Sequence, residues 1–484
     1  MAPEPSTSPS DGARRRFRLD HFERGMLALA AAILIYQLVI PPVVGVFDNG
    51  DWGKIMGPLG LEHMSNTPEE MHQFLNLKFR FTSPWWGNGY IVSGRLVARI
   101  ARTIGIVVSK DGLFDLRVLG LLHAALLVWG LALIMRAASV LHPISRRVLA
   151  VLLVFVFTDV GYVAFLNSFY SQAESLCFLV IAAGFFALIV CGRSWRWCTF
   201  LGFVAAATLF AASKPQEAPQ ALFLAALALL AARVLGPRRG AIIGVFSAAL
   251  IIAAAGVCYW KASRVVREPV LYNAFFQELL GNSPNPVNDL SSLGLNPDMA
   301  RYAGTHAFVA DSPIQDPAFR AAFFDRMSSG RVLLFYLARP SRLWELLKRR
   351  SASAFTIVTH YGNFEKRAGF PQGTRSSAFK VWSDFKRRAL PGSIWTVLLF
   401  FLGSLATAVF LYLRKATAPH HRVGLLAFAA LNLMALGAFL ICAVGDGTLD
   451  TVRQLYTFNA MTDLCLIAEA VALVEVVRRR WGRA

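Results

Sequence analysis

Long stretches of apolar residues without a charged side chain recur along the chain. Two of them, Ser175 to Cys191 and Gly240 to Trp260, contain no charge at all. An α-helix rises about 1.5 Å per residue, so about 20 residues cross the roughly 30 Å of hydrocarbon in a bilayer. Core helices of a soluble protein would not repeat this pattern so often. The sequence therefore predicts an all-α polytopic membrane protein.

The same pattern predicts about ten transmembrane helices. They cover residues 26–47, 116–136, 147–166, 174–191, 198–213, 218–235, 240–260, 393–413, 423–444 and 455–477. No apolar run precedes the first of them, which we expect to be a retained signal anchor. The organisation that follows is a disordered cytoplasmic tail at 1–25, seven spans in 26–260 with a first outer loop at 48–115, a long outer region at 261–392, and three spans with a basic cytoplasmic tail at 393–484.

Positive charges indicate the orientation. Arg and Lys cluster at both termini and in every second loop, as they do on the cytoplasmic side of a membrane. The short loops on the other side contain only Lys214 and Arg453. We therefore expect both termini in the cytoplasm. The clusters are Arg14, Arg15, Arg16 and Arg18; Arg146 and Arg147; Arg193 and Arg196; Arg238 and Arg239; Arg414, Lys415 and Arg422; and Arg478, Arg479, Arg480 and Arg483.

Each long outer loop contains an amphipathic segment. If residues 89–102 are helical, three arginines share one face and three apolar residues share the opposite face. These are Arg95, Arg99 and Arg102, and Val97, Ile100 and Ile104. Residues 332–347 predict two further helices, the second beginning at Pro340. Such helices suit the outer membrane interface, where we expect lipid headgroups to contact Arg331, Arg339 and Arg342.

Composition narrows the class of protein. Hydrophobic residues make up 56% of the chain and charged residues only 16%, with a net charge of +20. Much of the positive excess lies at the ends of predicted spans, which argues against nucleic-acid binding. The six cysteines lie in or beside apolar spans and show neither metal-ligand spacing nor a disulfide framework.

Polar residues gather on the outer side of the predicted spans. Asp48 and Asp51 follow the first span on a glycine-containing turn. Ionisable residues at membrane depth are costly, and they generally face a bundle interior or a wet cavity. We therefore predict a polar cavity that opens to the outer side. The short outer loops add Asn167, Tyr170, Glu174, Lys214, Gln216 and Arg453.

A carboxylate opposite cations suits the transfer of an activated sugar. The carboxylate can deprotonate an acceptor hydroxyl or amide, while the cations bind the departing phosphate. Nucleotide sugars and ATP are absent outside the cytoplasm, so the sugar would arrive on a lipid carrier. A polyprenyl phosphate would enter such a cavity laterally, between the spans.

Six short pieces of sequence occur in order on the outer side. They are Asn49-Gly-Asp-Trp-Gly-Lys, Phe165-Leu-Asn-Ser-Phe-Tyr-Ser-Gln-Ala-Glu, Ser213-Lys-Pro-Gln, Tyr272-Asn-Ala-Phe-Phe, Leu293-Gly-Leu-Asn-Pro and Arg453-Gln-Leu-Tyr-Thr-Phe-Asn-Ala-Met-Thr-Asp. Their order resembles the GT-C superfamily of integral membrane glycosyltransferases. It is also similar to bacterial glycan-biosynthesis hexose transferases of the WsfD-like kind.

The resemblance implies a glycosyltransferase that uses a polyprenyl-phosphate-linked sugar on the outer face of the bacterial cytoplasmic membrane, in cell-envelope glycan biosynthesis. By the same resemblance Asp48 or Asp51 is the general base, and Lys214 and Arg453 meet the carrier phosphate. We expect partial burial to raise the pKa of the base toward the working pH. The remaining polar residues expected in the substrate site are Asn167, Tyr170, Glu174 and Gln216. The acceptor, a glycan, lipid or protein, stays open.

The chain departs from metal-dependent oligosaccharyltransferases in its second outer loop. That loop offers Glu174 but no Asp-x-Asp motif, so a divalent metal is possible but not favoured. Two other functions stay open, namely an outer-face polysaccharide polymerase or ligase and a lipid or glycan transporter of the flippase type. A transporter would place ionisable residues near the membrane midplane with symmetry between its halves, and neither feature is clear in the sequence.

Overall fold

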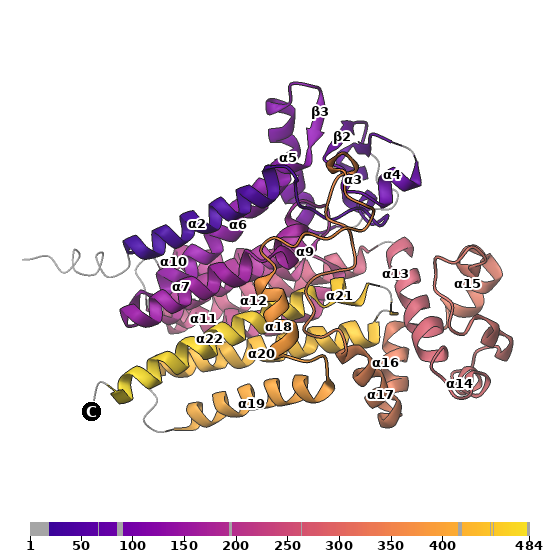
Figure 1. Cartoon of the computed structure of the whole chain (residues 1–484). Coiled ribbons are helices and arrows are strands. Elements are labelled where there is room, and N and C mark those ends of the chain that lie inside the picture. The colour runs from indigo at the N-terminus through magenta and orange to yellow at the C-terminus, as the bar shows by residue number, and fades with distance from the viewer. Residues whose placement is uncertain are drawn as a thin grey trace, which may run out of the picture.

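The computed structural model describes residues 19–481 apart from 66, 85–90, 193–195, 263, 415–418, 446 and 449. Long helices run side by side in a bundle (Figure 1). Helix α2 begins and α22 ends at the same end of this bundle, which we call the terminal end. The bundle helices are α2 (His21–Val39), α6 (Leu116–Ala137), α7 (Pro143–Phe157), α9 (Gln172–Val190), α10 (Arg196–Ala211), α11 (Ala221–Ala232), α12 (Pro237–Trp260), α19 (Ile394–Leu413), α20 (Pro419–Gly445) and α22 (Tyr456–Trp481).

The apolar runs of the sequence account for these helices. Among the described residues, seven helices are long and apolar enough to cross a membrane, and a bent pair makes up to eight. The multi-pass prediction is therefore confirmed, while the count of ten stays a prediction. Helix α10 is shorter than the seven, and α22 carries Asp463, Glu469 and Glu475 along its length.

The bent pair consists of α7 and the short helix α8 (Val160–Val163), and the bend measures 54°. Asp159 stands at the break, where its side chain accepts a hydrogen bond from the Gly161 amide at 2.8 Å and so caps α8. A capping carboxylate satisfies an amide that the break would otherwise leave without a partner.

Two glycines let α6 and α9 pack closely. A Cβ atom on Gly184 would lie 2.6 Å from the Leu133 Cβ, and one on Gly130 would lie 2.9 Å from Val180 Cγ1. Small residues at a helix contact allow the two backbones to approach, which is how dispersion forces hold helices together in a membrane.

The opposite end of the bundle, called the loop end below, carries two compact units (Figure 1). The first contains an antiparallel sheet of order β1-β2-β3, in which Phe79 pairs with Phe114 and both rings are buried. The sequence analysis expected only helices, and it missed this sheet because its strands are three or four residues long. The elements are α3 (Gly53–Leu59), β1 (Leu61–His63), α4 (Pro68–His72), β2 (Lys78–Phe81), α5 (Ser93–Val108) and β3 (Leu113–Asp115).

Helix α5 corresponds to the amphipathic segment expected at 89–102, of which residues 89 and 90 lie outside the described part. Its buried side is made of small residues and Val97, while Ile100 and Ile104 are exposed. Val97 therefore differs in burial from the two isoleucines, and the interfacial role of this helix stays a prediction. Ser93 donates its amide to the Ala212 carbonyl at 2.9 Å, which fixes the start of α5 beside the end of α10.

The second unit at the loop end has a hydrophobic core of its own, in which Phe276 and Phe323 pack with ring centroids 4.8 Å apart. The expected helix pair around Pro340 is present as α16 and α17. Arg342 pairs with Asp289 inside this unit, so its guanidinium is occupied by protein. The elements are α13 (Arg264–Tyr272), the π-helical η5 (Asn273–Leu280), α14 (Pro286–Ser292), α15 (Pro317–Phe323), α16 (Ser329–Leu337) and α17 (Pro340–Ser351).

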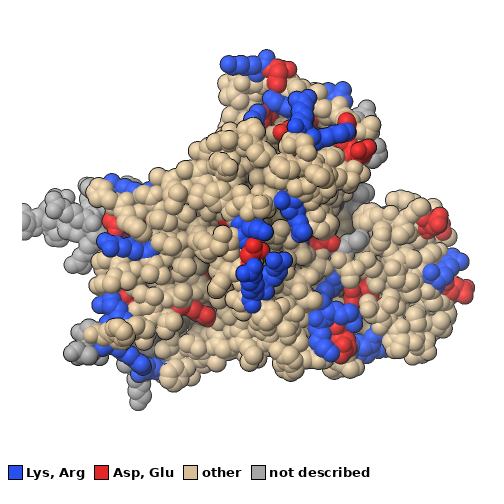
Figure 2. Space-filling model, in the orientation of Figure 1, with Lys and Arg blue, Asp and Glu red and all other residues tan. Residues whose placement is uncertain are grey.

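Helix α18 (Val381–Ala389) lies against the side of the bundle and was not expected from the sequence (Figure 1). Lys386 on α18 contacts Asp463 of α22 at 2.6 Å, and both side chains are fully buried. Charged side chains are unevenly distributed over the molecular surface. Figure 2 shows Lys and Arg gathered at the terminal end, at the loop end and over α18, with mostly uncharged surface between them.

Candidate functional site

The first polar turn places its two carboxylates in different surroundings. Asp48 is buried, and its Oδ1 accepts hydrogen bonds from the amides of Gly50 and Trp52 at 2.8 and 3.0 Å. Its Oδ2 lies 3.0 Å from Nε2 of His63. Gly50 has a φ of +98°, a conformation that side chains rarely adopt, which explains the glycine. Asp48 therefore holds the turn together.

Asp51 faces away from these contacts and keeps 31% of its side-chain surface exposed. Nη1 of Arg453 donates to Asp51 Oδ2 at 2.7 Å, and Nζ of Lys54 contacts the other carboxylate oxygen. Arg453 lies on the short helix α21 (Thr451–Gln454), and its Nη2 donates to Asp450 at 2.9 Å. One guanidinium therefore joins two carboxylates from opposite ends of the sequence.

Aromatic and amide groups surround these four charged residues, Asp51, Lys54, Asp450 and Arg453, which we call the Asp51 cluster. The Arg453 guanidinium lies 4.8 Å from the ring centroid of Tyr170, which is within the range of a cation–π contact. Asn49 Nδ2 donates to the hydroxyl of Tyr361 and to Asp450, in both cases at 3.0 Å. The Tyr170 hydroxyl donates to Asn49 Oδ1 at 2.8 Å. Both polar ends of the Asn49 side chain are thus used to hold the cluster.

The two cations decide the electrostatics of Asp51. Burial by itself raises the pKa of this carboxyl, but the neighbouring Arg453 and Lys54 outweigh burial and hold the pKa well below its ordinary value. The expectation of a raised pKa is therefore wrong for Asp51. The physical reason is that both cations contact the carboxylate directly and favour its charged form.

Lys214 is paired with an acid outside this cluster. It is 6% exposed, and its Nζ lies 3.2 Å from Glu217, which is itself buried. Gln216 donates to the Gln454 carbonyl at 3.1 Å. The helical turn η3 (Pro215–Gln220), which carries Gln216, is thereby attached to the end of α21, next to Arg453.

Asn167 and Glu174 occupy buried structural contacts. Asn167 donates to the carbonyls of Leu38 and Val44 at 3.0 and 2.9 Å, which fixes the chain where α2 ends. Glu174 Oε1 lies 3.1 Å from Nε2 of His123, a histidine on α6 with no exposed surface. Neither residue contacts Asp51, so their expected place in a substrate site stays a prediction.

The His123–Glu174 pair is also fixed by a backbone carbonyl. Nδ1 of His123 lies 2.9 Å from the Leu166 carbonyl, which can only accept, so Nδ1 is the donor of this hydrogen bond. Nε2 on the other side of the ring faces a carboxylate oxygen of Glu174. Sequence reasoning missed His123 because a single histidine in an apolar span gives no sign of its partner.

Four further members of the site were also missed or left without a role: Asn49, Lys54, Tyr361 and Asp450. Asn49 and Lys54 belong to the first of the six sequence pieces, and Asp450 lies three positions before Arg453, which begins the last of them. Tyr361 had no signal, because it lies in the long outer region without a recognisable motif. Among the residues that are described, no three His, Cys, Asp or Glu side chains form a group that could hold a metal ion.

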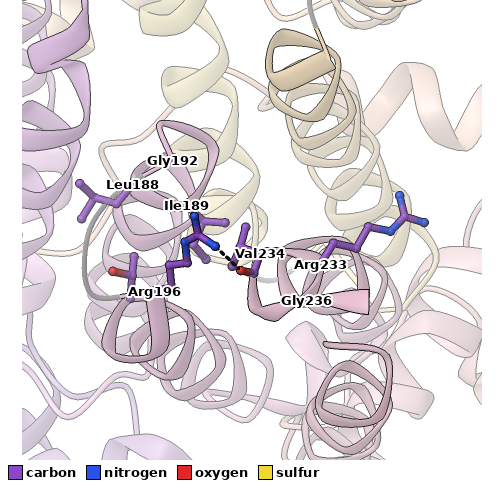
Figure 3. Close-up of a pocket in the computed structure, with 8 residues that line it drawn as sticks. Leu188, Ile189, Gly192, Arg196, Arg233, Val234 and Gly236 are labelled. Carbon is purple, nitrogen blue, oxygen red and sulfur yellow. Dashed lines mark hydrogen bonds between the residues drawn. The ribbon is translucent and has the colours of Figure 1, made fainter. Parts of the chain in front are cut away.

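A cavity of about 230 Å³ lies elsewhere, beside the turn between α11 and α12. Figure 3 shows Arg196 reaching toward Val234 while Arg233 points away from it. Nη1 of Arg196 donates to the Val234 carbonyl at 3.2 Å, so this arginine locks the two loops together. The cavity shares no residue with the Asp51 cluster.

Comparison with known proteins supports the membrane assignment. A family model described as the YfdI N-terminal transmembrane domain matches residues 19–483, nearly the whole chain. The chain belongs to this family. No curated protein matches this member of the YfdI family in sequence.

Among solved structures, the YfdI-family chain matches the apo oligosaccharyltransferase of Archaeoglobus fulgidus. The identity is 13% and the TM-score is 0.41, and the match covers 96% of this chain and 52% of the archaeal chain. The YfdI-family chain therefore spans about half the length of that protein. A likeness this distant assigns neither activity nor site residues, so the function is argued below from the side chains.

Proposed function

We propose that this protein is a membrane glycosyltransferase that transfers a sugar from a polyprenyl-phosphate carrier on the outer face of the bacterial cytoplasmic membrane, in cell-envelope glycan biosynthesis. The observation that carries the proposal is the Asp51–Arg453 contact at 2.7 Å, formed at the loop end of a membrane bundle. It places a partly exposed carboxylate beside a guanidinium. These are the two groups that deprotonation of an acceptor and departure of a phosphate require.

The transfer step assigns one role to each group. Asp51 accepts the proton of the acceptor hydroxyl, whose oxygen bonds to the anomeric carbon of the sugar. The bond from that carbon to the carrier phosphate breaks, and the phosphate leaves with the electron pair. Arg453 stabilises the charge that develops on the phosphate, and Lys214, the residue before η3, supports it.

Arrival of the carrier also prepares the base. A phosphate that draws Arg453 toward itself weakens the contact between Arg453 and Asp51. Because that contact lowers the pKa of Asp51, its weakening raises the pKa and makes the carboxylate a stronger base. The resting ion pair therefore keeps Asp51 inactive until donor is bound.

The two aspartates provide the test. Asp51→Asn keeps the shape of the side chain and removes its basicity, so transfer should fall by roughly 10²–10⁴-fold while donor lipid still binds. Transfer is measured with purified protein and radiolabelled polyprenyl-phosphate sugar.

Asp48→Asn is the matched control, because Asp48 holds the turn and does not contact Arg453. This variant should lower the thermal unfolding midpoint and retain transfer in the folded fraction. Full transfer by well-expressed Asp51→Asn protein would remove Asp51 as the base and withdraw the main support for the proposed activity.

A further inference from the structure

The second unit at the loop end contacts the short helix that carries Arg453. Arg350 lies in the last turn of α17 and is 4% exposed. Its Nη1 donates to the Thr451 hydroxyl at 3.0 Å, and its Nη2 donates to Glu278 at 3.1 Å. Thr451 is the first residue of α21, two positions before Arg453. One buried guanidinium therefore joins the second unit to α21.

This guanidinium is not needed to neutralise Glu278. The Glu278 carboxylate also pairs with Arg349 at 2.7 Å, so one acid is shared by two arginines. Burial of a second cation is costly, and an apolar side chain of similar volume would fill the same space without that cost. What Arg350 adds is the contact to α21, which no apolar residue could make.

The second unit also holds the loop before α21. Gln277 precedes Glu278 on the π-helical η5, and its Oε1 accepts from the Thr448 amide at 3.2 Å. A π-helix is rare and is found frequently at functional sites. Two adjacent residues of η5 therefore hold the chain on either side of Asp450, one directly and the other through Arg350.

Asp450 lies between these two contacts in an unfavourable backbone conformation. Its φ is +56°, in the left-handed region that residues other than glycine seldom adopt. Such a conformation persists where the surrounding structure enforces it. The Asp450 side chain accepts from Arg453 at 2.9 Å and from Asn49 at 3.0 Å. The contacts on either side of Asp450 thus hold one of the two carboxylates that orient the Arg453 guanidinium.

We infer that Arg350 is a positioning residue, which holds α21 against the second unit so that the Arg453 guanidinium stays in contact with Asp51. The inference rests on the proposed glycosyltransferase activity for its catalytic consequence, but the order of α21 can be measured without turnover. By this inference the second unit controls the base of the proposed reaction through one side chain.

Arg350→Met and Arg349→Met form a matched pair of variants, because each leaves Glu278 paired with the other arginine. Within the described part of the chain, Arg350 donates to α21 and Arg349 does not. The readout is hydrogen–deuterium exchange of the α21 peptide, measured by mass spectrometry on the full chain in lipid nanodiscs. The amides of Gln454 and Leu455 donate to carbonyls of this segment at 3.0 and 2.9 Å, so they report its order.

Arg350→Met should speed exchange in α21 about tenfold, the factor expected for loss of one charge-assisted hydrogen bond. Exchange in the long bundle helices should stay as in the wild type, and Arg349→Met should leave α21 unchanged. Thr451→Val removes the acceptor without changing the arginine and should match Arg350→Met. Thr451→Ser restores the hydroxyl and should return exchange toward the wild-type rate.

The pH profile of transfer gives the catalytic readout. Arg453 lowers the pKa of Asp51, so a loosened α21 should raise this pKa. The ionised carboxylate is the active base, and the acidic limb of the profile should therefore move to higher pH in Arg350→Met and not in Arg349→Met. A general loss of stability would lower the amount of active protein without moving the limb.

The outcomes separate this inference from the proposed function. Wild-type exchange in α21 of both Arg350→Met and Thr451→Val would overturn the positioning role, even if the wild-type protein transfers sugar. Equal acceleration in Arg350→Met and Arg349→Met would overturn it as well. Faster exchange confined to α21 in Arg350→Met and Thr451→Val supports it, and would still do so if the wild-type protein transferred no sugar and the proposed activity failed.

Discussion

Arg453 contacts two carboxylates and an aromatic ring at once, and this arrangement makes the chemistry of Asp51 depend on a single side chain. The guanidinium is 10% exposed and divides its donors between Asp51 and Asp450. Arg suits this position because its planar fork presents several donors in fixed directions, whereas the ammonium group of Lys is a single point charge.

Arg453→Gln should change the pH dependence of transfer. Arg453 lowers the pKa of Asp51, so its removal should raise that pKa. The active base is the ionised form, and the rate falls as pH drops through the pKa. The acidic limb of the rate–pH profile should therefore move to higher pH, and higher pH should restore part of the lost activity. Arg453→Lys keeps the charge and should move the limb less. An unmoved limb in Arg453→Gln would contradict the role of Arg453 beside the base.

Lys214 should affect donor binding and stability through different partners. Lys214→Ala should weaken donor-lipid affinity about ten- to hundredfold, since a charge-assisted contact contributes roughly 1.5–3 kcal/mol. It also leaves Glu217 buried without its cation, which should lower the unfolding midpoint. The double variant Lys214→Ala/Glu217→Gln should recover stability but not donor affinity. Normal donor affinity in the single variant would exclude Lys214 from the phosphate site.

At the scale of elements, α18 is fixed to the bundle by a buried polar network. Lys386 contacts Asp463, and the Trp382 indole donates to the same carboxylate at 2.9 Å. The amide of Ser383 donates to Asp159, the residue that caps α8, at 2.8 Å. This network joins α18, the break after α7 and the first turns of α22, so it shapes the bundle beside the loop end.

Lys386→Met should therefore destabilise the protein strongly. Removal of one partner from a buried ion pair leaves an uncompensated charge, which costs about 3–5 kcal/mol. Lys386→Met/Asp463→Asn should cost less, because neither charge then stays buried alone. Arg387→Met is the control, since Arg387 is 65% exposed. Unfolding midpoints in detergent test this order, and equal midpoints for Lys386→Met and Arg387→Met would show that the network does not hold α18.

For the whole molecule, charge and apolarity divide the structure along the bundle. Basic groups gather at both ends and over α18, and the surface between the terminal end and α18 is mostly uncharged on the face shown, as suits contact with a bilayer (Figure 2). The Asp51 cluster belongs to the loop end. A donor in the membrane and an acceptor in water could therefore meet on one side.

Reporter fusions test which side this is. Fusions after Arg196, Arg239 and Arg422 should score cytoplasmic, and a fusion near Pro297 should score outside, because Arg and Lys are retained on the cytoplasmic side. Fusions that disrupt the fold are controlled by expression level and by a second insertion in the same loop. An outside score at Arg239 would overturn the orientation and place the Asp51 cluster in the cytoplasm.

The sequence by itself determined the long apolar helices of this protein, because the signal for a membrane helix is local. An apolar run such as Gly240 to Trp260 has the same length in any fold, and α12 follows it closely at Pro237–Trp260. Pro340 likewise predicted the start of α17, because proline favours the first turn of a helix whatever the tertiary contacts are. The polar residues of the outer loops could be identified as candidates for the same reason, since each loop follows an apolar run that the sequence shows.

Only the tertiary structure decided which candidates act together. Asp48 and Asp51 are three positions apart and alike in sequence, yet one holds a turn and the other contacts Arg453, 402 positions away. Packing also decided that Lys214 pairs with Glu217 and that His123 meets Glu174. Contacts of this kind depend on how the helices and loops are placed in space. The pattern of hydropathy and charge along the chain does not predict that placement.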